Sequence, residues 1–281
     1  MSHSAPSFFT RAYYCVKPFV PRRVRWILRR SVARKILPRS ADVWPIDQSS
    51  ATTPDGWPGW PEEKEFAVVL THDVESQVGL DQVRPLAELE LELGFRSSFN
   101  FIPEGEYRVP DELREWLVEH GFEVGIHDLH HDGTLYSSRE AFRKNAVRIN
   151  RYLDEWKACG FRSAFMLRRL GWLHDLDIRY DCSTFDTDPF EPQPDGAGTI
   201  FPFRVPESGE GGKSGYIELP YTLAQDSTLF LLLSEDSPDI WNRKLDWIVE
   251  QQGLALVNVH PDYMDFGGDS ADDHKYPASI Y

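Results

Sequence analysis

The sequence predicts an α/β protein built on a parallel β-sheet, either open or closed into a barrel. After residue 65, short apolar segments alternate with longer amphipathic ones, which is the pattern of repeated strand–helix units. The length of 281 residues suits a single α/β barrel. The sequence contains no internal repeat and no low-complexity tract that would indicate another architecture.

Several segments have the length and composition of buried strands. Each is a short run rich in aliphatic and aromatic side chains, and several are followed by polar residues at the point where a strand would end. The expected strands cover residues 66–70, 95–101, 122–126, 161–165, 179–183, 216–219 and 254–259.

Amphipathic segments between these strands are predicted to be helices, and local signals mark some of their ends. Gly94, Gly121 and Gly253 stand where three of the helices should stop. The sequence Ser137-Ser-Arg-Glu140 is a capping box, which favours the start of a helix. The expected helices cover residues 81–93, 111–120, 137–160, 167–176 and 237–253.

Positive charge is concentrated at the start of the chain. Residues 1–41 contain ten Lys or Arg and no acid, and a net charge of −15 for the whole chain leaves −25 on the remainder. Residues 42–65 contain four prolines and two glycines, as expected of a linker or an irregular segment. We therefore expect residues 1–65 to form a basic N-terminal arm and linker, and residues 66–281 to form the α/β domain.

The arm interleaves its charges with apolar side chains such as Trp26, Ile27 and Leu28. This pattern suits peripheral contact with an anionic membrane surface; the alternative is that the arm folds back onto its own acidic body. The acidic balance of the chain argues against a nucleic-acid partner. There is no signal-peptide pattern and no membrane-spanning apolar run, and the three cysteines are scattered. We therefore expect a cytoplasmic protein, with its arm at the inner membrane face.

Acidic and imidazole side chains follow two of the predicted strands. His127 and His131 lie four residues apart after one strand. Asp73 and Glu75 lie two apart beyond another, so an extended backbone would point both to one side. The carboxyl ends of parallel strands meet at one edge of a sheet. Imidazole nitrogen and carboxylate oxygen together suit zinc, or manganese, iron or cobalt. The pattern predicts a divalent-metal site in which one carboxylate binds the ion and the other accepts a proton.

Other strand ends add groups suited to proton transfer. His260 directly follows predicted strand 254–259, where it could protonate a leaving group. Arg162 lies in another predicted strand, and Asp186 or Asp188 follows a further one. These charged side chains could orient the reacting groups by charge-assisted hydrogen bonds.

The order of these motifs resembles that of the polysaccharide deacetylases, the NodB-like carbohydrate esterases of family 4. That family has a Thr-Phe-Asp-Asp-Gly motif, a His-(Ser/Thr)-x-x-His motif, an Arg-x-Pro motif, an Asp-containing motif and a late strand that ends in His. The matching segments here are residues 71–75, 127–131, 161–164, 180–186 and 259–261. The two spaced histidines and the late histidine are the specific matches.

The resemblance implies a fold and an acid–base pair. The fold would be a distorted, incomplete (β/α)7-type barrel, preceded here by the basic extension. Asp73 would be the catalytic base, with Arg162 as its tether. His260 would be the general acid, and Asp186 would tune it.

The resemblance also implies a set of metal ligands. His127 and His131 would bind the ion. The family's second Asp, which normally completes the set, is Val74 here, and Glu75 follows one residue later as its replacement. The Pro of the third motif is Ala164.

These expectations combine into a metal-dependent hydrolase that removes an N-acetyl group from an amino sugar in surface-polysaccharide or glycan biosynthesis. Its cofactor would be a divalent ion, with zinc the first choice. Its substrate would be an N-acetylated sugar or a sugar-linked intermediate, carried on a lipid or a nucleotide. Two alternatives stay open: a related amidohydrolase acting on a non-sugar amide, and a non-catalytic glycan-assembly protein that retains the fold.

Overall fold

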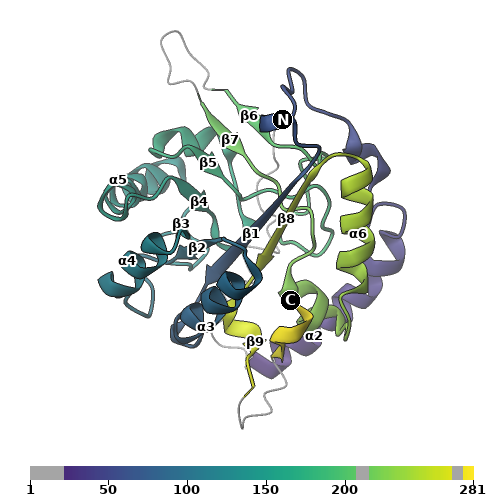
Figure 1. Ribbon diagram of the computed structural model, residues 1–281, viewed down its shortest axis with the longest axis horizontal. Helices are drawn as coiled ribbons and strands as arrows, with labels where there is room; N and C mark the ends of the chain where they lie inside the picture. Colours follow the sequence, from purple (N-terminus) through teal and green to yellow (C-terminus); the bar gives the residue numbers. More distant parts are fainter. Residues whose placement is uncertain (1–21, 207–214, 268–274) are drawn as a thin grey trace.

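A computed structural model describes residues 22–206, 215–267 and 275–281, and its centre is a curved sheet of eight strands (Figure 1). In spatial order the sheet is β6-β7-β5-β4-β3-β2-β1-β8. All of its strands run parallel except β6, which is antiparallel to β7 at one edge. The strands are β1 (Ala67–Val74), β2 (Ser98–Phe101), β3 (Glu123–His127), β4 (Gly160–Arg162), β5 (Tyr180–Asp181), β6 (Phe203–Val205), β7 (Tyr216–Glu218) and β8 (Leu254–Val259).

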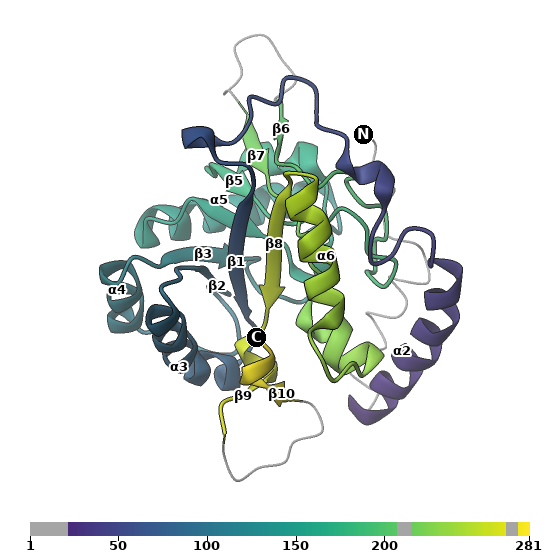
Figure 2. The same cartoon turned by 45° about the vertical axis from the view of Figure 1, so that its right-hand side comes forward.

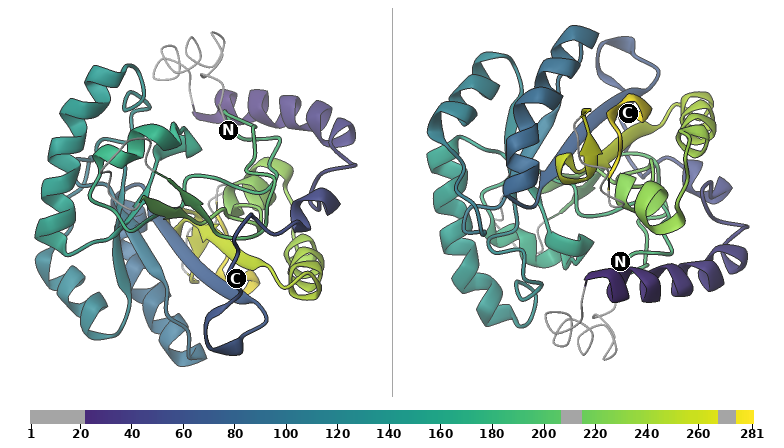
Figure 3. Two further views of the ribbon diagram at one scale, coloured as in Figure 1. Left: turned by 90° about the horizontal axis from the view of Figure 1, so that it is seen from above. Right: turned by 90° about the horizontal axis from the view of Figure 1, so that it is seen from below.

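Helices cover the outer side of this sheet, as the end-on views in Figure 3 show. Three of them connect successive parallel strands from β1 to β4, and another precedes β8. The α-helices are α2 (Arg22–Ile36), α3 (Gln77–Leu93), α4 (Asp111–Glu119), α5 (Arg139–Trp156) and α6 (Asp239–Glu250). This architecture is the distorted, incomplete α/β barrel that the sequence predicts.

Each predicted strand overlaps a strand of the sheet, and β8 has the predicted bounds. β1 is longer than predicted because its polar half still pairs, with Thr71 opposite Ser98 and Val74 opposite Phe101 in β2. Figure 2 shows β1 and β8 side by side at the centre of the molecule. The extension of β1 matters for the site, because it holds Asp73 inside the sheet.

The prediction of a helix over residues 167–176 is wrong. Only a 3-10 turn forms there, at Leu170–Asp175. Leu167 (φ −69°, ψ 133°) and Arg169 (φ −143°, ψ 88°) have extended or irregular backbone angles, which an α-helix cannot accommodate. The predicted capping box does not form, because the N-cap is Ser138, not Ser137: its hydroxyl accepts a hydrogen bond from the backbone N–H of Ala141 at 3.0 Å, and Ala141 cannot return one.

The basic arm contains a helix, α2, that the sequence reasoning did not predict. It packs against a π-helix at Ser227–Leu233. Ala33 is buried there, and Nε of Arg30 donates to the carbonyl oxygen of Leu231 at 2.9 Å. The described part of the arm thus folds back onto the body, whereas residues 1–21 lie outside the described residues. None of the described helices is long and apolar enough to cross a bilayer.

Candidate metal and acid–base site

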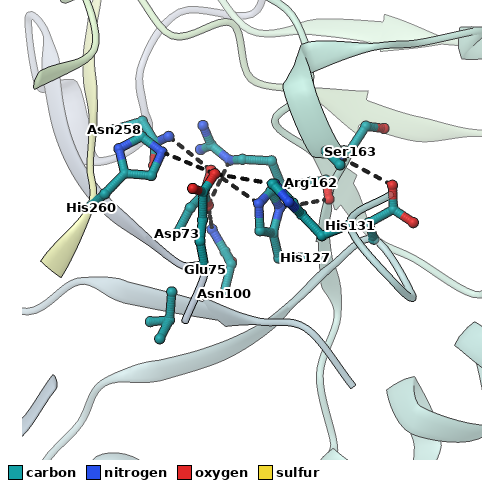
Figure 4. Close-up of polar contacts among 12 residues, drawn as sticks. Asp73, Glu75, Asn100, His127, His131, Arg162, Ser163, Asn258 and His260 are labelled. Atoms are coloured by element: carbon teal, nitrogen blue, oxygen red, sulfur yellow. Dashed lines mark hydrogen bonds and ion pairs between the residues drawn. The ribbon is translucent and has the colours of Figure 1, made fainter. Parts of the chain in front are cut away.

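Side chains predicted to bind metal or transfer protons meet at the carboxyl edge of the sheet (Figure 4). Asp73 lies near the end of β1, His127 ends β3, and Arg162 ends β4. His260 follows β8 directly. Parallel strands explain this convergence, because their carboxyl ends emerge at one edge and the adjoining loops build the site there.

Alternation along the end of β1 decides which residues reach the site. Val74 is fully buried in the apolar core. Asp73 and Glu75 flank it, and both point into the site (Figure 4), as expected when side chains alternate between the two faces of a strand. A carboxylate at position 75 therefore shares the side of Asp73, whereas one at position 74 would enter the core.

Glu75, His127 and His131 form a group that could hold a metal ion. Each offers one ligand atom, and these atoms lie within 4.8 Å of one another. The loop between the histidines curls back sharply, because Asp128 has a φ of 58° and His131 a φ of 56°. The Asp128 carboxylate stabilises this loop by accepting hydrogen bonds from the backbone N–H groups of Leu129 (2.6 Å) and Ala164 (3.3 Å).

The hydrogen bonding of His127 fits a metal ligand. Its Nδ1 lies 3.2 Å from the carbonyl oxygen of Arg162 and must donate to it, which leaves Nε2 unprotonated on a neutral ring. Burial is the main reason that the pKa of His127 falls to about 4, so the ring is neutral at neutral pH. Nε2 of His127 is buried without a hydrogen-bond partner among the described residues, and Nε2 of His131 lies 3.1 Å from Oε1 of Glu75. A divalent ion between these side chains would satisfy the His127 nitrogen and replace the contact between His131 and Glu75.

Asp73 is held as a carboxylate by three neighbours. The side-chain amide of Asn100 donates to one oxygen at 2.9 Å, and that of Asn258 donates to the other at 2.8 Å. Nε of Arg162 lies 3.4 Å from Oδ1. Burial alone would raise the pKa of Asp73, but nearby charges, with Arg162 the strongest, outweigh it and the pKa is lowered. Asp73 is therefore ionised and able to accept a proton.

His260 is paired with Asp226, which the sequence reasoning did not single out. Nδ1 of His260 donates to Oδ1 of Asp226 at 2.6 Å, and the backbone N–H of His260 donates to Oδ2 at 2.8 Å. Burial alone would lower the pKa of His260, but Asp226 outweighs it and the pKa rises to about 10. The ring therefore keeps its proton at neutral pH, with Nε2 3.8 Å from a Glu75 oxygen.

The expectation that Asp186 tunes His260 is wrong. Asp186 is a buried partner of Lys244, whose ammonium lies 3.0 Å from Oδ1 and 2.8 Å from Oδ2. An isolated β-bridge pairs Leu223 with Val257 of β8. Because Leu223 lies three residues before Asp226, this bridge brings Asp226 to His260 instead. That bridge is too short to leave a strand pattern in the sequence.

Asn100 and Asn258 were also missed, although a signal existed for both. Each is a polar residue inside an apolar strand next to β1, and Asn100 is the register partner of Asp73. Asp262 and Tyr263 follow His260 and contact Glu75. No spacing in the sequence indicated those contacts.

Comparisons with known proteins bear on the fold. No family model matches the sequence, and no curated protein sequence matches it. The crystal structure of a candidate polysaccharide deacetylase from Mycobacterium smegmatis has a TM-score of 0.58 at 18% sequence identity, and the match covers 75% of this chain and 82% of that one.

Two further structures match less well. The chitin deacetylase of Colletotrichum lindemuthianum has a TM-score of 0.36 at 16% identity, and the match covers 68% of this chain and 84% of that one. A family 4 carbohydrate esterase from Streptomyces lividans, in complex with acetate, has a TM-score of 0.39 at 11% identity, with coverage of 70% and 79%.

The curved parallel sheet and the helices that cover it define a fold class, the distorted α/β barrels. Within that class, this chain has the fold of the NodB-like polysaccharide deacetylases of carbohydrate esterase family 4. The resemblance drawn from the sequence motifs is confirmed at the level of the fold.

Proposed function

We propose that this protein is a metal-dependent N-deacetylase that acts on an N-acetylated amino sugar. The observation that supports it most directly is the convergence of Glu75, His127 and His131 within 4.8 Å, beside an ionised Asp73 and a protonated His260. A base, an acid and a set of metal ligands together suit metal-assisted hydrolysis of an amide.

Glu75, His127 and His131 would hold the ion, and their oxygen and nitrogen donors suit zinc before manganese, iron or cobalt. When bound, such an ion would polarise the amide carbonyl and make a water molecule acidic enough to react near neutral pH. The buried Nε2 of His127, which has no hydrogen-bond partner among the described residues, is the structural reason to expect it, together with the close approach of Glu75 and His131 at 3.1 Å.

Asp73 would take the proton from the attacking water. Asn100 and Asn258 each occupy one of its oxygens, so they fix the carboxylate plane while leaving further lone pairs free. His260 would give a proton from Nε2 to the departing nitrogen, since Asp226 holds Nδ1 and keeps the ring charged.

The substrate class that we propose is an amino sugar in glycan or surface-polysaccharide assembly, on the cytoplasmic side of the membrane. The similarity in fold to the Mycobacterium smegmatis structure supports the proposal of a deacetylase. The basic arm supports a substrate that is presented at a membrane or carries an anionic carrier group.

The outer face of α2 supports a membrane contact of that kind. Ile27, Leu28 and Val32 are 66%, 54% and 56% exposed, and the helix contains no acidic residue. Apolar side chains flanked by Arg and Lys on one helix suit the interface of an anionic bilayer. The inner face of the same helix is used to pack on the body, so α2 would present its outer face while staying attached.

The central test combines metal analysis with acetate release from a panel of N-acetylated sugars. The parent protein should bind about one equivalent of zinc and release acetate. Asp73→Asn should keep the zinc but lose roughly 10²-fold or more in rate, since general base catalysis is typically worth 10²–10⁴. Asp154→Asn, a change at an exposed acid, is the matched control and should behave like the parent. Full acetate release by Asp73→Asn, or absence of zinc from the parent, would contradict the proposal.

A further inference from the structure

Glu75 is placed less securely by the sheet than the other residues of the site. The pairing of β1 with β2 ends at Val74 opposite Phe101, so Glu75 lies on the turn between β1 and α3. Its side chain is 25% exposed, against 2% for His127. A metal ligand on a turn needs other contacts to fix its direction.

Asp262 supplies such contacts from the loop that follows β8. Its Oδ2 accepts a hydrogen bond from the backbone N–H of Glu75 at 3.0 Å, and its Oδ1 accepts one from the hydroxyl of Ser76. Both oxygens are thus occupied by the turn. The next residue, Tyr263, donates its hydroxyl to Oε2 of Glu75 at 3.2 Å.

The start of α3 accommodates the carboxylate of Asp262. Ser76 is the N-cap residue of α3, yet its side chain makes no capping hydrogen bond to the helix. Asp262 lies at that helix end instead, where a negative charge is favourable. A Cβ on Gly79 would lie 2.0 Å from Oδ2 of Asp262, so a glycine at this position leaves room for the carboxylate.

We propose that Asp262 is a positioning residue that sets the direction of Glu75 toward the metal. It acts through the backbone of Glu75 and is not itself a ligand. Because His260 lies two residues before it, one short loop fixes both the proposed acid and the proposed carboxylate ligand. This inference rests on the proposed metal site.

The test measures zinc affinity of the full-length, metal-stripped chain by calorimetry, together with its melting temperature. Asp262→Ala should weaken zinc binding about tenfold or more, the range seen for groups that orient metal ligands. Asp262→Asn retains an oxygen for the Glu75 N–H and an amide that the Ser76 hydroxyl can accept from, so it should recover most of the affinity.

Ser138→Ala is the matched control, because Ser138 caps α5 through its own side chain. It should lower the melting temperature as any lost cap does, without changing zinc affinity. Gly79→Ala is a second route to the same effect: it keeps Asp262 but forces its carboxylate away, and it should also weaken zinc binding.

Zinc affinities of Asp262→Ala and Gly79→Ala within twofold of the parent would overturn the inference. An equal loss in Ser138→Ala would also overturn it, because the effect would then be one of helix stability. No zinc binding by the parent would overturn the proposed metal site itself, and this inference with it.

Discussion

Val74 and Glu75 show how an acidic residue can shift by one position in the sequence and still reach the same site. The family motif places its second acid where this chain has Val74, and that side chain is packed in the core. An acid there would bury a charge with no partner, at a cost of several kcal/mol. At position 75 the carboxylate returns to the side of Asp73, with its oxygens near His131 and Tyr263.

Gly125 is a second residue whose identity is explained by the site. It lies in β3, and a Cβ on it would lie 2.1 Å from Oδ1 of Asn100. Asn100 holds Asp73. A side chain at position 125 would therefore disturb the proposed base through its hydrogen-bond partner.

The role of Asp226 gives a residue-scale prediction. Asp226→Asn replaces one of the two oxygens that His260 uses, so the ring loses its ion pair and part of its orientation. We expect kcat to fall about 10-fold to 100-fold while zinc affinity stays near that of the parent. Steady-state acetate release and calorimetry would measure the two quantities.

Asp186→Asn is the discriminating comparison for this prediction. It removes a buried acid of the same type that pairs with Lys244, so it should lower stability but leave kcat of the folded protein near the parent value. A larger loss of kcat in Asp186→Asn than in Asp226→Asn would show that the acid partner has been misassigned.

At the scale of elements, α2 combines two faces with different uses. On its inner face, Ala33 is buried, and Nε of Arg30 donates a hydrogen bond to the π-helix. That π-helix begins directly after Asp226. Removing the whole arm would therefore disturb an element next to the site, and point changes on the outer face are the cleaner probe of membrane contact.

The vesicle prediction follows from the outer face. The parent should bind vesicles containing anionic phospholipid, more weakly as salt is raised, and bind neutral vesicles poorly. Leu28→Glu with Val32→Glu should abolish most of this binding in a sedimentation assay. Val118→Glu with Val147→Glu places the same two charges at valines of α4 and α5 that are 58% and 73% exposed, and should bind like the parent. If the parent ignores anionic vesicles at low salt, α2 serves the fold alone.

At the scale of the whole molecule, some buried acids oppose stability at neutral pH. Asp188 and Glu191 share the hydroxyl of Tyr221, at 2.8 and 3.1 Å. Burial is the main cause that raises the pKa of Asp188 to about 6 and that of Glu191 to about 7. Both acids are therefore more easily protonated in the folded chain than in the unfolded one.

The sign of the pH effect follows from these raised pKa values. Their contribution to stability is complete below the unfolded pKa, near 4, and is lost as pH rises through 6 to 7. Glu191→Gln imitates the neutral acid and still accepts from Gln225. We expect its free energy of unfolding, relative to the parent, to increase between about pH 4.5 and 7 in urea titrations. Glu119→Gln, at an exposed acid, should show no such trend; a constant difference for Glu191→Gln would contradict the prediction.

Local periodicity along the chain was sufficient to predict some parts of this protein. Apolar runs located the strands, and glycines marked several helix ends. Spacing placed Asp73 and Glu75 on one side at the end of β1, and it placed His127 and His131 at the end of β3 and in the loop that follows it. These inferences hold because side-chain direction repeats every two residues in a strand, and because strand ends share one edge of a parallel sheet.

The groups that support those residues come from contacts between distant segments and could not be predicted from local patterns. The hydrogen bond between Asp226 and His260 spans 34 positions, and the one between Asp262 and Glu75 spans 187. Neither Asp226 nor Asp262 lies in a long strand or at a spacing that would indicate its contact. No pattern in the chain could therefore select Asp226 over Asp186. The same holds for α2, whose position on the π-helix depends on packing between segments about 200 residues apart. Contacts of this kind are fixed by the closure of the fold, when distant loops are brought to the same edge of the sheet.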